Sequence, residues 1–326
     1  MARTRYASDP GLIARMGATM FLLGLVFVGF AVGLVYLIAY YTSHRHGGNG
    51  SPVNVDVLIF FAAVIGIGSA LGSYYWSDKI ALRTSGARLV SPNDGADAAR
   101  LHGIVDRLCA LADMPKPRIA IAPTQMPNAF ATGRNSKVAV LCATRGILDT
   151  NKLSDEELEG VLAHEMSHVA HKDVAVMTIA SFLGIIAGLM VRFAFYSELF
   201  GGRGRDSNNQ SALLVIPIML LSIVVYAVSF LLIRLLSRYR ELSADRSGAL
   251  LTGRPAALAS ALVKVTGDIG RIPVRDLREA EPLNAFYFAP ALRSGQSLAT
   301  IFSTHPSLKR RLEELDKISQ QLGQQR

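Results

Sequence analysis

Residues 154–173 read SDEELEGVLAHEMSHVAHKD and predict one capped helix that carries two histidines. Ser154 and Glu157 form a capping box, in which each side chain accepts a hydrogen bond from the backbone N–H of the other residue. His164 and His168 are four residues apart, so their Cβ atoms lie about 5–6 Å apart on one face of the helix. We expect the helix to run to the end of this stretch and to present both imidazoles to one partner.

The pattern His164-Glu165-x-x-His168 indicates a zinc site. Two imidazoles on one face can bind one zinc ion at about 2.0–2.1 Å. Glu165 then lies beside the metal, where it can take a proton from the water that the metal activates. A chance match in this chain has a probability below about one in a hundred, and the alternative is a pair of surface histidines. His171 lies roughly 10 Å along the helix axis from His164, too far to share the ion. The metzincin pattern fails because Val174 stands where it needs histidine.

The segment RELSAD, residues 240–245, offers the third ligand that a catalytic zinc needs. Glu241 is the candidate. Asp245 shares its helical face and can accept a hydrogen bond from a ligand imidazole, which would fix the tautomer of that imidazole. Spacing alone equally permits a solvated or salt-bridged face, because Arg238 and Arg246 lie nearby.

Four stretches of the chain contain no Asp, Glu, Lys or Arg. They are residues 17–41, 57–77, 174–191 and 211–233. A helix needs about 20 apolar residues to cross the hydrocarbon of a bilayer. The third stretch is shorter than this. It reaches the needed length only if it extends past Arg192 to residue 196, with the Arg192 side chain reaching to the interface. The first stretch exceeds the apolar region of about 7–15 residues in a signal peptide, so we expect it to be retained. The sequence thus predicts four transmembrane helices in two hairpins.

Composition and charge agree with a membrane protein. Half of the residues are hydrophobic and 18% are charged, against about 25% charged in soluble chains. Basic residues near the span ends set the orientation. One side holds Arg3, Arg5, Arg15, Lys79, Arg83, Arg88, Lys172, Arg234, Arg238 and Arg240, and the other holds Arg45, Arg192, Arg203 and Arg205. This excess places both termini in the cytoplasm. It also accounts for much of the net charge of +9, and no basic stretch with interleaved aromatics favours nucleic acid.

The expected organisation alternates membrane and cytoplasmic parts. A transmembrane hairpin covers residues 1–78, a cytoplasmic catalytic part 79–173, a second hairpin 174–236 with spans 174–196 and 211–233, and a cytoplasmic part 237–326. The catalytic part is predicted to be α+β, with a helix at 96–112 and strands at 118–122 and 137–143. Region 271–304 has mixed polarity and gives no assignment. Because two crossings separate His168 from Glu241, both lie on the same side of the membrane.

The residues together resemble the HtpX-like membrane zinc metallopeptidases, which are relatives of the CAAX prenyl endopeptidases. The resemblance covers nearly the whole chain and rests on PNAFATG at 127–133, on His164–His168 with Asp173 following, on Glu241 with Asp245, and on HPS at 305–307 with Arg311. The order of two spans, catalytic helix, two spans and glutamate is also similar.

The resemblance implies a mainly α membrane protein with a zincin-type catalytic domain that binds one zinc per chain. It implies His164, His168 and Glu241 as ligands, Glu165 as general base and then acid, Asp173 and Asp245 as supports of the ligands, Asn128 and His305 as groups that hold the substrate or the oxyanion, and Arg311 as the residue that fixes the C-terminal segment against the site. We expect an extended peptide to bind by strand addition near Asn128. The implied role is quality control of misfolded or membrane proteins in a bacterial-type inner membrane, with the active site in the cytoplasm and the oligomeric state open.

Three other functions compete with this interpretation. The first is a CAAX-type prenyl-peptide protease, but the resemblance implies more transmembrane spans for that role than the four predicted here. A channel or transporter needs ionisable groups deep in the membrane, and here Asp56 and Arg192 lie only at segment edges. An inactive membrane scaffold would not need the intact set of His164, Glu165 and His168.

Overall fold

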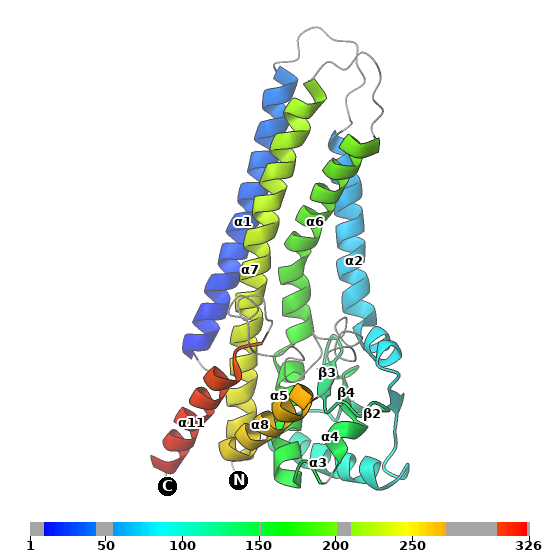
Figure 1. Ribbon diagram of the computed structural model, residues 1–326, viewed down its shortest axis with the longest axis vertical. Coiled ribbons are helices and arrows are strands. Elements are labelled where there is room, and N and C mark those ends of the chain that lie inside the picture. The colour runs from blue at the N-terminus through cyan, green and yellow to red at the C-terminus, as the bar shows by residue number, and fades with distance from the viewer. Residues whose placement is uncertain (1–9, 44–54, 150, 201–209, 272–304, 325–326) are drawn as a thin grey trace. The chain divides into compact units, whose positions relative to one another are not determined.

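The computed structural model describes residues 10–43, 55–149, 151–200, 210–271 and 305–324 (Figure 1). The helices are α1 (Pro10–Ser43), α2 (Val55–Thr84), α3 (Ala96–Ala112), α4 (Arg145–Leu148), α5 (Asp155–Ala170), α6 (Asp173–Phe200), α7 (Gln210–Thr252), α8 (Pro255–Arg271) and α11 (Leu308–Gln324). The strands are β1 (Arg88–Leu89), β2 (Arg118–Ala122), β3 (Ala129–Thr132) and β4 (Val140–Thr144). Region 272–304, which the sequence left unassigned, lies outside the described residues.

The chain divides into two compact units. The helical unit comprises residues 17–73 and 177–236. The α+β unit comprises 74–176 and 237–326 together with 1–16, and it carries every predicted site residue. The helices α1, α2, α6 and α7 therefore each begin in one unit and end in the other.

The described helices include segments that can cross a membrane. Two segments, Pro10–Phe30 and Ile216–Thr252, are long and apolar enough by themselves. A third passes only as the pair Asp155–Ala170 and Asp173–Ile186, which is bent by 58°. The expected span at 57–77 lies within α2. A membrane protein with a mostly helical fold is therefore supported, and the full set of four crossings stays a prediction.

The sheet has the strand order β1-β2-β4-β3. Strands β2 and β4 are parallel, whereas β3 pairs with β4 in the antiparallel sense and forms one edge of the sheet. The sequence predicted a strand at 137–143, but β4 begins at Val140 and ends at Thr144. Strand β3 was missed because its sequence, AFAT, is short and half alanine, which has low strand propensity. Its pairing with β4 determines its conformation.

Helix α5 begins as predicted and ends earlier than predicted. Ser154 Oγ accepts from Glu157 N–H at 3.3 Å, and Glu157 Oε2 accepts from Ser154 N–H at 2.8 Å, so the capping box is confirmed. The prediction of one helix to residue 173 is wrong. Lys172 has φ 56°, a left-handed conformation that breaks the hydrogen-bond ladder, and α6 begins at Asp173 with a bend of 58°. The bend turns the Asp173 side chain back toward α5.

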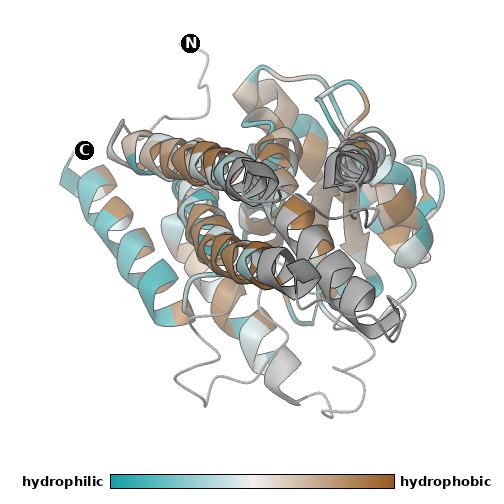
Figure 2. Ribbon diagram, turned by 90° about the horizontal axis from the view of Figure 1, so that it is seen from above, coloured by the Kyte–Doolittle hydropathy of each residue, from teal (hydrophilic) through white to brown (hydrophobic). Residues whose placement is uncertain are grey.

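Helices α3, α5, α8 and α11 pack with the sheet into one core of the α+β unit. Leu101, Leu162, Leu258 and Leu315 are each at most 1% exposed. Burying one such leucine stabilises the fold by about 1.5–3 kcal/mol. Figure 2 shows α11, at the C-terminal end, mostly hydrophilic with apolar residues along one side. This apolar side packs against α8 and so fixes the start of α11 beside the predicted site.

Candidate active site

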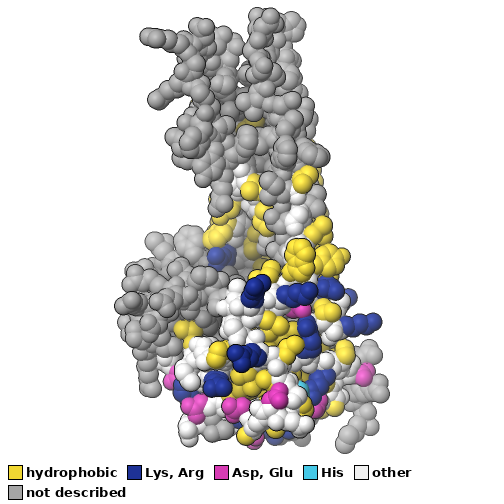
Figure 3. Space-filling view, turned by 90° about the vertical axis from the view of Figure 1, so that its right-hand side faces the viewer, with side chains coloured by type: hydrophobic (Ala, Val, Ile, Leu, Met, Phe, Trp, Pro, Cys, Tyr) yellow, Lys and Arg dark blue, Asp and Glu magenta, His cyan; other side chains and the backbone are white. Residues whose placement is uncertain are grey.

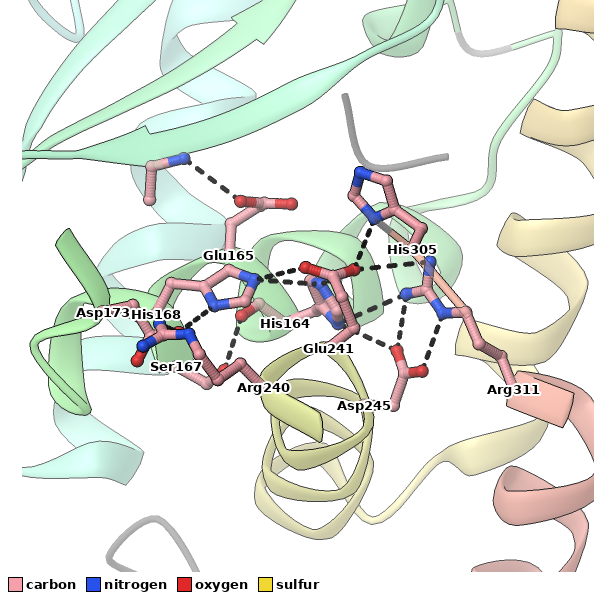
Figure 4. Close-up of polar contacts among 11 residues, drawn as sticks. His164, Glu165, Ser167, His168, Asp173, Arg240, Glu241, Asp245, His305 and Arg311 are labelled. Carbon is pink, nitrogen blue, oxygen red and sulfur yellow. Dashed lines mark hydrogen bonds and ion pairs between the residues drawn. The ribbon is translucent and has the colours of Figure 1, made fainter. Parts of the chain in front are cut away.

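The predicted metal ligands come together in the α+β unit (Figure 4). Helix α5 contributes His164 and His168, whose Nε2 atoms lie 3.3 Å apart. Helix α7 contributes Glu241. Its Oε2 lies 3.8 Å from Nε2 of His164, and its Oε1 lies 3.5 Å from Nε2 of His168. Three side chains from two helices therefore face one point.

The three separations fit a zinc ion. Tetrahedral zinc with bonds of about 2.0–2.1 Å holds its ligand atoms about 3.3 Å apart. Glu165 also offers a carboxylate oxygen within 4.8 Å of the histidine donors. Its Oε2, however, accepts a hydrogen bond from the backbone N–H of Ala131 at 3.1 Å. His164, His168 and a neighbouring carboxylate can therefore hold a metal ion, and both Glu241 and Glu165 lie within reach of the two imidazoles.

Both histidines have their outer nitrogen engaged by a carboxylate. His164 Nδ1 lies 2.9 Å from Asp245, and His168 Nδ1 lies 2.5 Å from Asp173. A carboxylate only accepts, so each Nδ1 carries the proton and each Nε2 keeps a lone pair for the metal. Burial lowers the pKa of His168 to about 4 and also lowers the pKa of His164, which keeps both rings neutral at pH 7.

Each of these aspartates is held by a buried arginine. Arg311 on α11 binds Asp245 through Nε at 2.7 Å and Nη2 at 2.6 Å, and it is 1% exposed. Arg240 on α7 contacts Asp173 and is 4% exposed. Burial alone would raise the pKa of Asp245, but the Arg311 guanidinium holds that pKa below its ordinary value. We call these sets the Asp245 triad (His164, Asp245, Arg311) and the Asp173 triad (His168, Asp173, Arg240).

His305 contacts the third ligand. It lies just before α11, is 7% exposed, and donates from Nδ1 to Glu241 Oε2 at 2.8 Å. Burial would raise the pKa of Glu241, but His305 and the two ligand histidines hold that pKa well below its ordinary value. The carboxylate is therefore ionised and ready to bind a cation.

Glu165 has the properties of a group that exchanges protons. It is 5% exposed, and burial together with the nearby Glu241 carboxylate raises its pKa well above the ordinary value. A bound divalent ion would act in the opposite direction, because its charge favours the carboxylate. Burial raises the pKa of Glu165 and a bound ion would lower it, so this carboxylate can both accept a proton and give it up.

Comparison with known proteins identifies the family. A model for peptidase family M48 matches residues 95–319, which include all the predicted site residues. The chain belongs to peptidase family M48. "Protease HtpX homolog 1" from Streptomyces coelicolor is 55% identical over 322 residues, covering 99% of this chain and 97% of that protein. "Protease HtpX homolog 2" from Methanosarcina mazei is 48% identical over 321 residues, covering 98% and 100%. The predicted resemblance to HtpX-like metallopeptidases is confirmed.

A solved structure also matches this M48 chain. The crystal structure of S. mikatae Ste24p has a TM-score of 0.49 and 17% sequence identity, and the alignment covers 92% of this chain and 66% of that chain.

In this M48 peptidase, Asn128 stands at the start of the edge strand β3. It is 4% exposed, its backbone N–H donates to Thr144 Oγ1 at 2.9 Å, and its carbonyl accepts from Thr144 N–H at 2.9 Å. Along an antiparallel strand such bonds alternate, so the main-chain groups of Ala129 and Ala131 face away from β4. The outer edge of β3 therefore runs beside Glu165, while the role of Asn128 itself stays a prediction.

Sequence reasoning missed two residues that shape the site of this M48 peptidase. One is Arg240 of the Asp173 triad. The other is Gly248, where a Cβ atom would lie 2.9 Å from the backbone nitrogen of His164. Gly248 follows Glu241 by seven residues on the same helical face, which was the available signal. The alternative of a solvated face is wrong, because Glu241 is 8% exposed and Asp245 is fully buried.

Proposed function

We propose that this M48 protease is a zinc endopeptidase embedded in a bacterial-type inner membrane, with its zinc held by His164, His168 and Glu241. The proposal rests above all on the convergence of three side chains whose nitrogen and oxygen atoms lie 3.3–3.8 Å apart. It includes four transmembrane helices in two hairpins, a zincin-type catalytic domain and an active site on the cytoplasmic side. The basic residues at the ends of the expected spans support that orientation.

Each residue near the ligands has a defined task in peptide hydrolysis. When bound, zinc would polarise the scissile carbonyl and lower the pKa of a coordinated water from about 15.7 toward 7. Glu165 keeps Oε2 on the Ala131 N–H, so its other oxygen takes the proton of the attacking water and passes it to the leaving amine. His305, which lies against Glu241, is proposed to stabilise the oxyanion together with Asn128.

The substrate is proposed to bind as an extended strand. The outward N–H and carbonyl of Ala129 and the outward carbonyl of Ala131 can pair with a peptide that lies along β3, while the Ala131 N–H holds Glu165 beside the carbonyl of that peptide. Such pairing favours unfolded segments of misfolded or membrane proteins and disfavours proline-rich or helical ones. Relatives named HtpX at 55% and 48% identity support this substrate class over prenylated CAAX peptides.

The experiment measures zinc content and chelator-sensitive cleavage of unfolded casein by the full chain in detergent. Glu165→Gln should retain zinc and lose about 10²–10⁴-fold in cleavage rate. Glu156→Gln is the matched control, because Glu156 lies on the same helix with its side chain 53% exposed. Cleavage by Glu165→Gln at the wild-type rate would refute the enzymatic assignment.

A further inference from the structure

The end of α2 within the α+β unit exposes one stripe of aromatic, aliphatic and basic side chains. Tyr75, Lys79 and Arg83 recur every four residues, and Trp76 and Ile80 repeat the same spacing one residue later, so they share a helical face. The exposed fractions are 52% for Tyr75, 58% for Trp76 and 49% for Ile80. Lys79 and Arg83 are also exposed. Large apolar side chains are unusual on such a face in water.

The charge of this stripe is entirely positive. Asp78 is the only acidic residue between positions 74 and 90. It is 7% exposed and is already paired with Arg118 at 2.6 Å. Strand β1 adds the exposed Arg88 and Leu89. Figure 3, which views the side of the molecule where α2 and β2 lie, shows a band of Lys and Arg side chains across it, with acidic side chains gathered farther down.

The stripe is fixed to the body of the unit rather than loosely attached. Arg134, just after β3, donates from Nη1 to the carbonyl of Tyr75 at 3.3 Å. Its guanidinium lies 5.3 Å from the centroid of the Tyr75 ring. The stripe and the strand beside the active site therefore hold a set position relative to each other.

We propose that this surface binds anionic phospholipid headgroups and holds the α+β unit against the bilayer. The docking stripe consists of Tyr75, Trp76, Lys79, Ile80, Arg83 and Arg88. Tyrosine and tryptophan favour the membrane–water interface, and clustered Lys and Arg bind anionic lipids. The inference rests on the proposed membrane placement of α2, because Tyr75 and Trp76 lie at the end of the expected span at 57–77 and Lys79, Ile80 and Arg83 follow on the same helix. Docking would restrict cleavage to segments near the membrane surface.

The experiment reports the depth of β1 in lipid nanodiscs that contain the full chain. Leu89, which is 52% exposed, is changed to cysteine and labelled with a small fluorophore. The native Cys109 and Cys142 are buried and do not compete for the label. A headgroup spin-labelled lipid then quenches the fluorophore when the stripe is docked. We expect strong quenching with phosphatidylglycerol present and weak quenching in phosphatidylcholine alone.

Charge removal tests the stripe directly. Each Lys or Arg near an anionic surface contributes about fivefold, so the triple variant Lys79→Gln, Arg83→Gln, Arg88→Gln should lower the docking equilibrium about 100-fold. The matched control, Lys116→Gln, Lys309→Gln, Lys317→Gln, removes the same charge elsewhere and should keep the quenching.

Equal quenching with and without phosphatidylglycerol would overturn the docking inference. An equal loss of quenching in the two triple variants would overturn it as well. Casein cleavage by the same preparations in detergent separates this failure from that of the proposed function. If cleavage persists without lipid-dependent quenching, only docking fails. If docking is seen in a chain that neither binds zinc nor cleaves casein, the docking inference stands and the proposed function fails.

Discussion

The Asp245 triad and the Asp173 triad support the two histidines with the same chemistry and different architecture. Arg311 reaches Asp245 through two hydrogen bonds from α11, and it also lies 3.9 Å from Glu241. The Asp245 triad therefore joins three helices at one buried point. The Asp173 triad is partly local, because Asp173 stands at the bend only five residues after His168. One ligand thus depends on the C-terminal helix and the other on a turn.

The difference indicates where the site is most easily broken. A ligand held through a distant helix loses its support whenever that helix detaches, whereas a ligand held across a short turn keeps most of its geometry. Removing one partner of a buried ion pair leaves an uncompensated charge. We therefore expect substitutions in the Asp245 triad to have larger effects than equivalent substitutions in the Asp173 triad.

Arg311→Ala is expected to have the largest effect. It leaves Asp245 buried without its cation, which should lower the free energy of unfolding by about 3–5 kcal/mol. Zinc affinity should fall more than about 100-fold, because the support of His164 is lost as well. Denaturant unfolding and zinc titration in detergent measure both. Arg310→Ala is the control, since Arg310 is the exposed neighbour on α11. Equal stability and equal zinc affinity of the two variants would contradict the supporting role of the Asp245 triad.

Arg240→Ala should have a smaller effect than Arg311→Ala. Asp173 keeps its hydrogen bond to His168 and loses only its cation, so zinc affinity should fall about 10–100-fold with the chain still folded. Arg240→Lys keeps the charge without the planar guanidinium and should recover part of this loss. A larger loss of zinc affinity for Arg240→Ala than for Arg311→Ala would reverse the proposed ranking of the triads.

The two triads also differ in what the sequence could predict. The spacing of His164 and His168 on one helix placed both imidazoles on a shared face, and the capping box fixed where that helix begins. Arg240 was counted only as a flanking charge. Its contact with Asp173 depends on the helix break after Ala170, which the sequence does not indicate. The edge strand β3 was missed for a similar reason, since its conformation depends on β4. Long-range packing, such as that of Gly248 against His164, has only a weak local signal: Gly248 shares the helical face of Glu241, but the sequence does not say which element approaches it.

Gly248→Ala tests how closely α7 must approach α5. The added Cβ would lie 2.9 Å from the backbone nitrogen of His164, so one helix must shift. Overpacking of this kind costs about 1–3 kcal/mol of stability, and zinc affinity should fall about tenfold as His164 moves. At Gly267 on α8 an added Cβ meets no atom within 4 Å. Gly267→Ala should therefore leave both quantities unchanged or raise stability slightly, and a matching loss there would remove the packing explanation.

The smallest expected effect is that of pH on zinc affinity. Protons compete with zinc for an imidazole only below its pKa. Burial lowers the pKa of His168 to about 4, so this ring stays neutral at pH 5.5, and burial also lowers the pKa of His164 below its ordinary value. Zinc affinity should therefore fall less between pH 7.5 and pH 5.5 than it would with two ordinary imidazoles. Imidazoles with an ordinary pKa of about 6.5 would each lose about tenfold, and competition titrations at both pH values distinguish these results.

The central claim is that His164, His168 and Glu241 bind one zinc ion together. Metal analysis of the purified full chain and of Glu241→Ala, with a competing chelator to measure affinity, tests it most directly. We predict one zinc per chain in the wild type and at least about tenfold weaker binding in Glu241→Ala. Unchanged zinc stoichiometry and affinity in Glu241→Ala would contradict the claim.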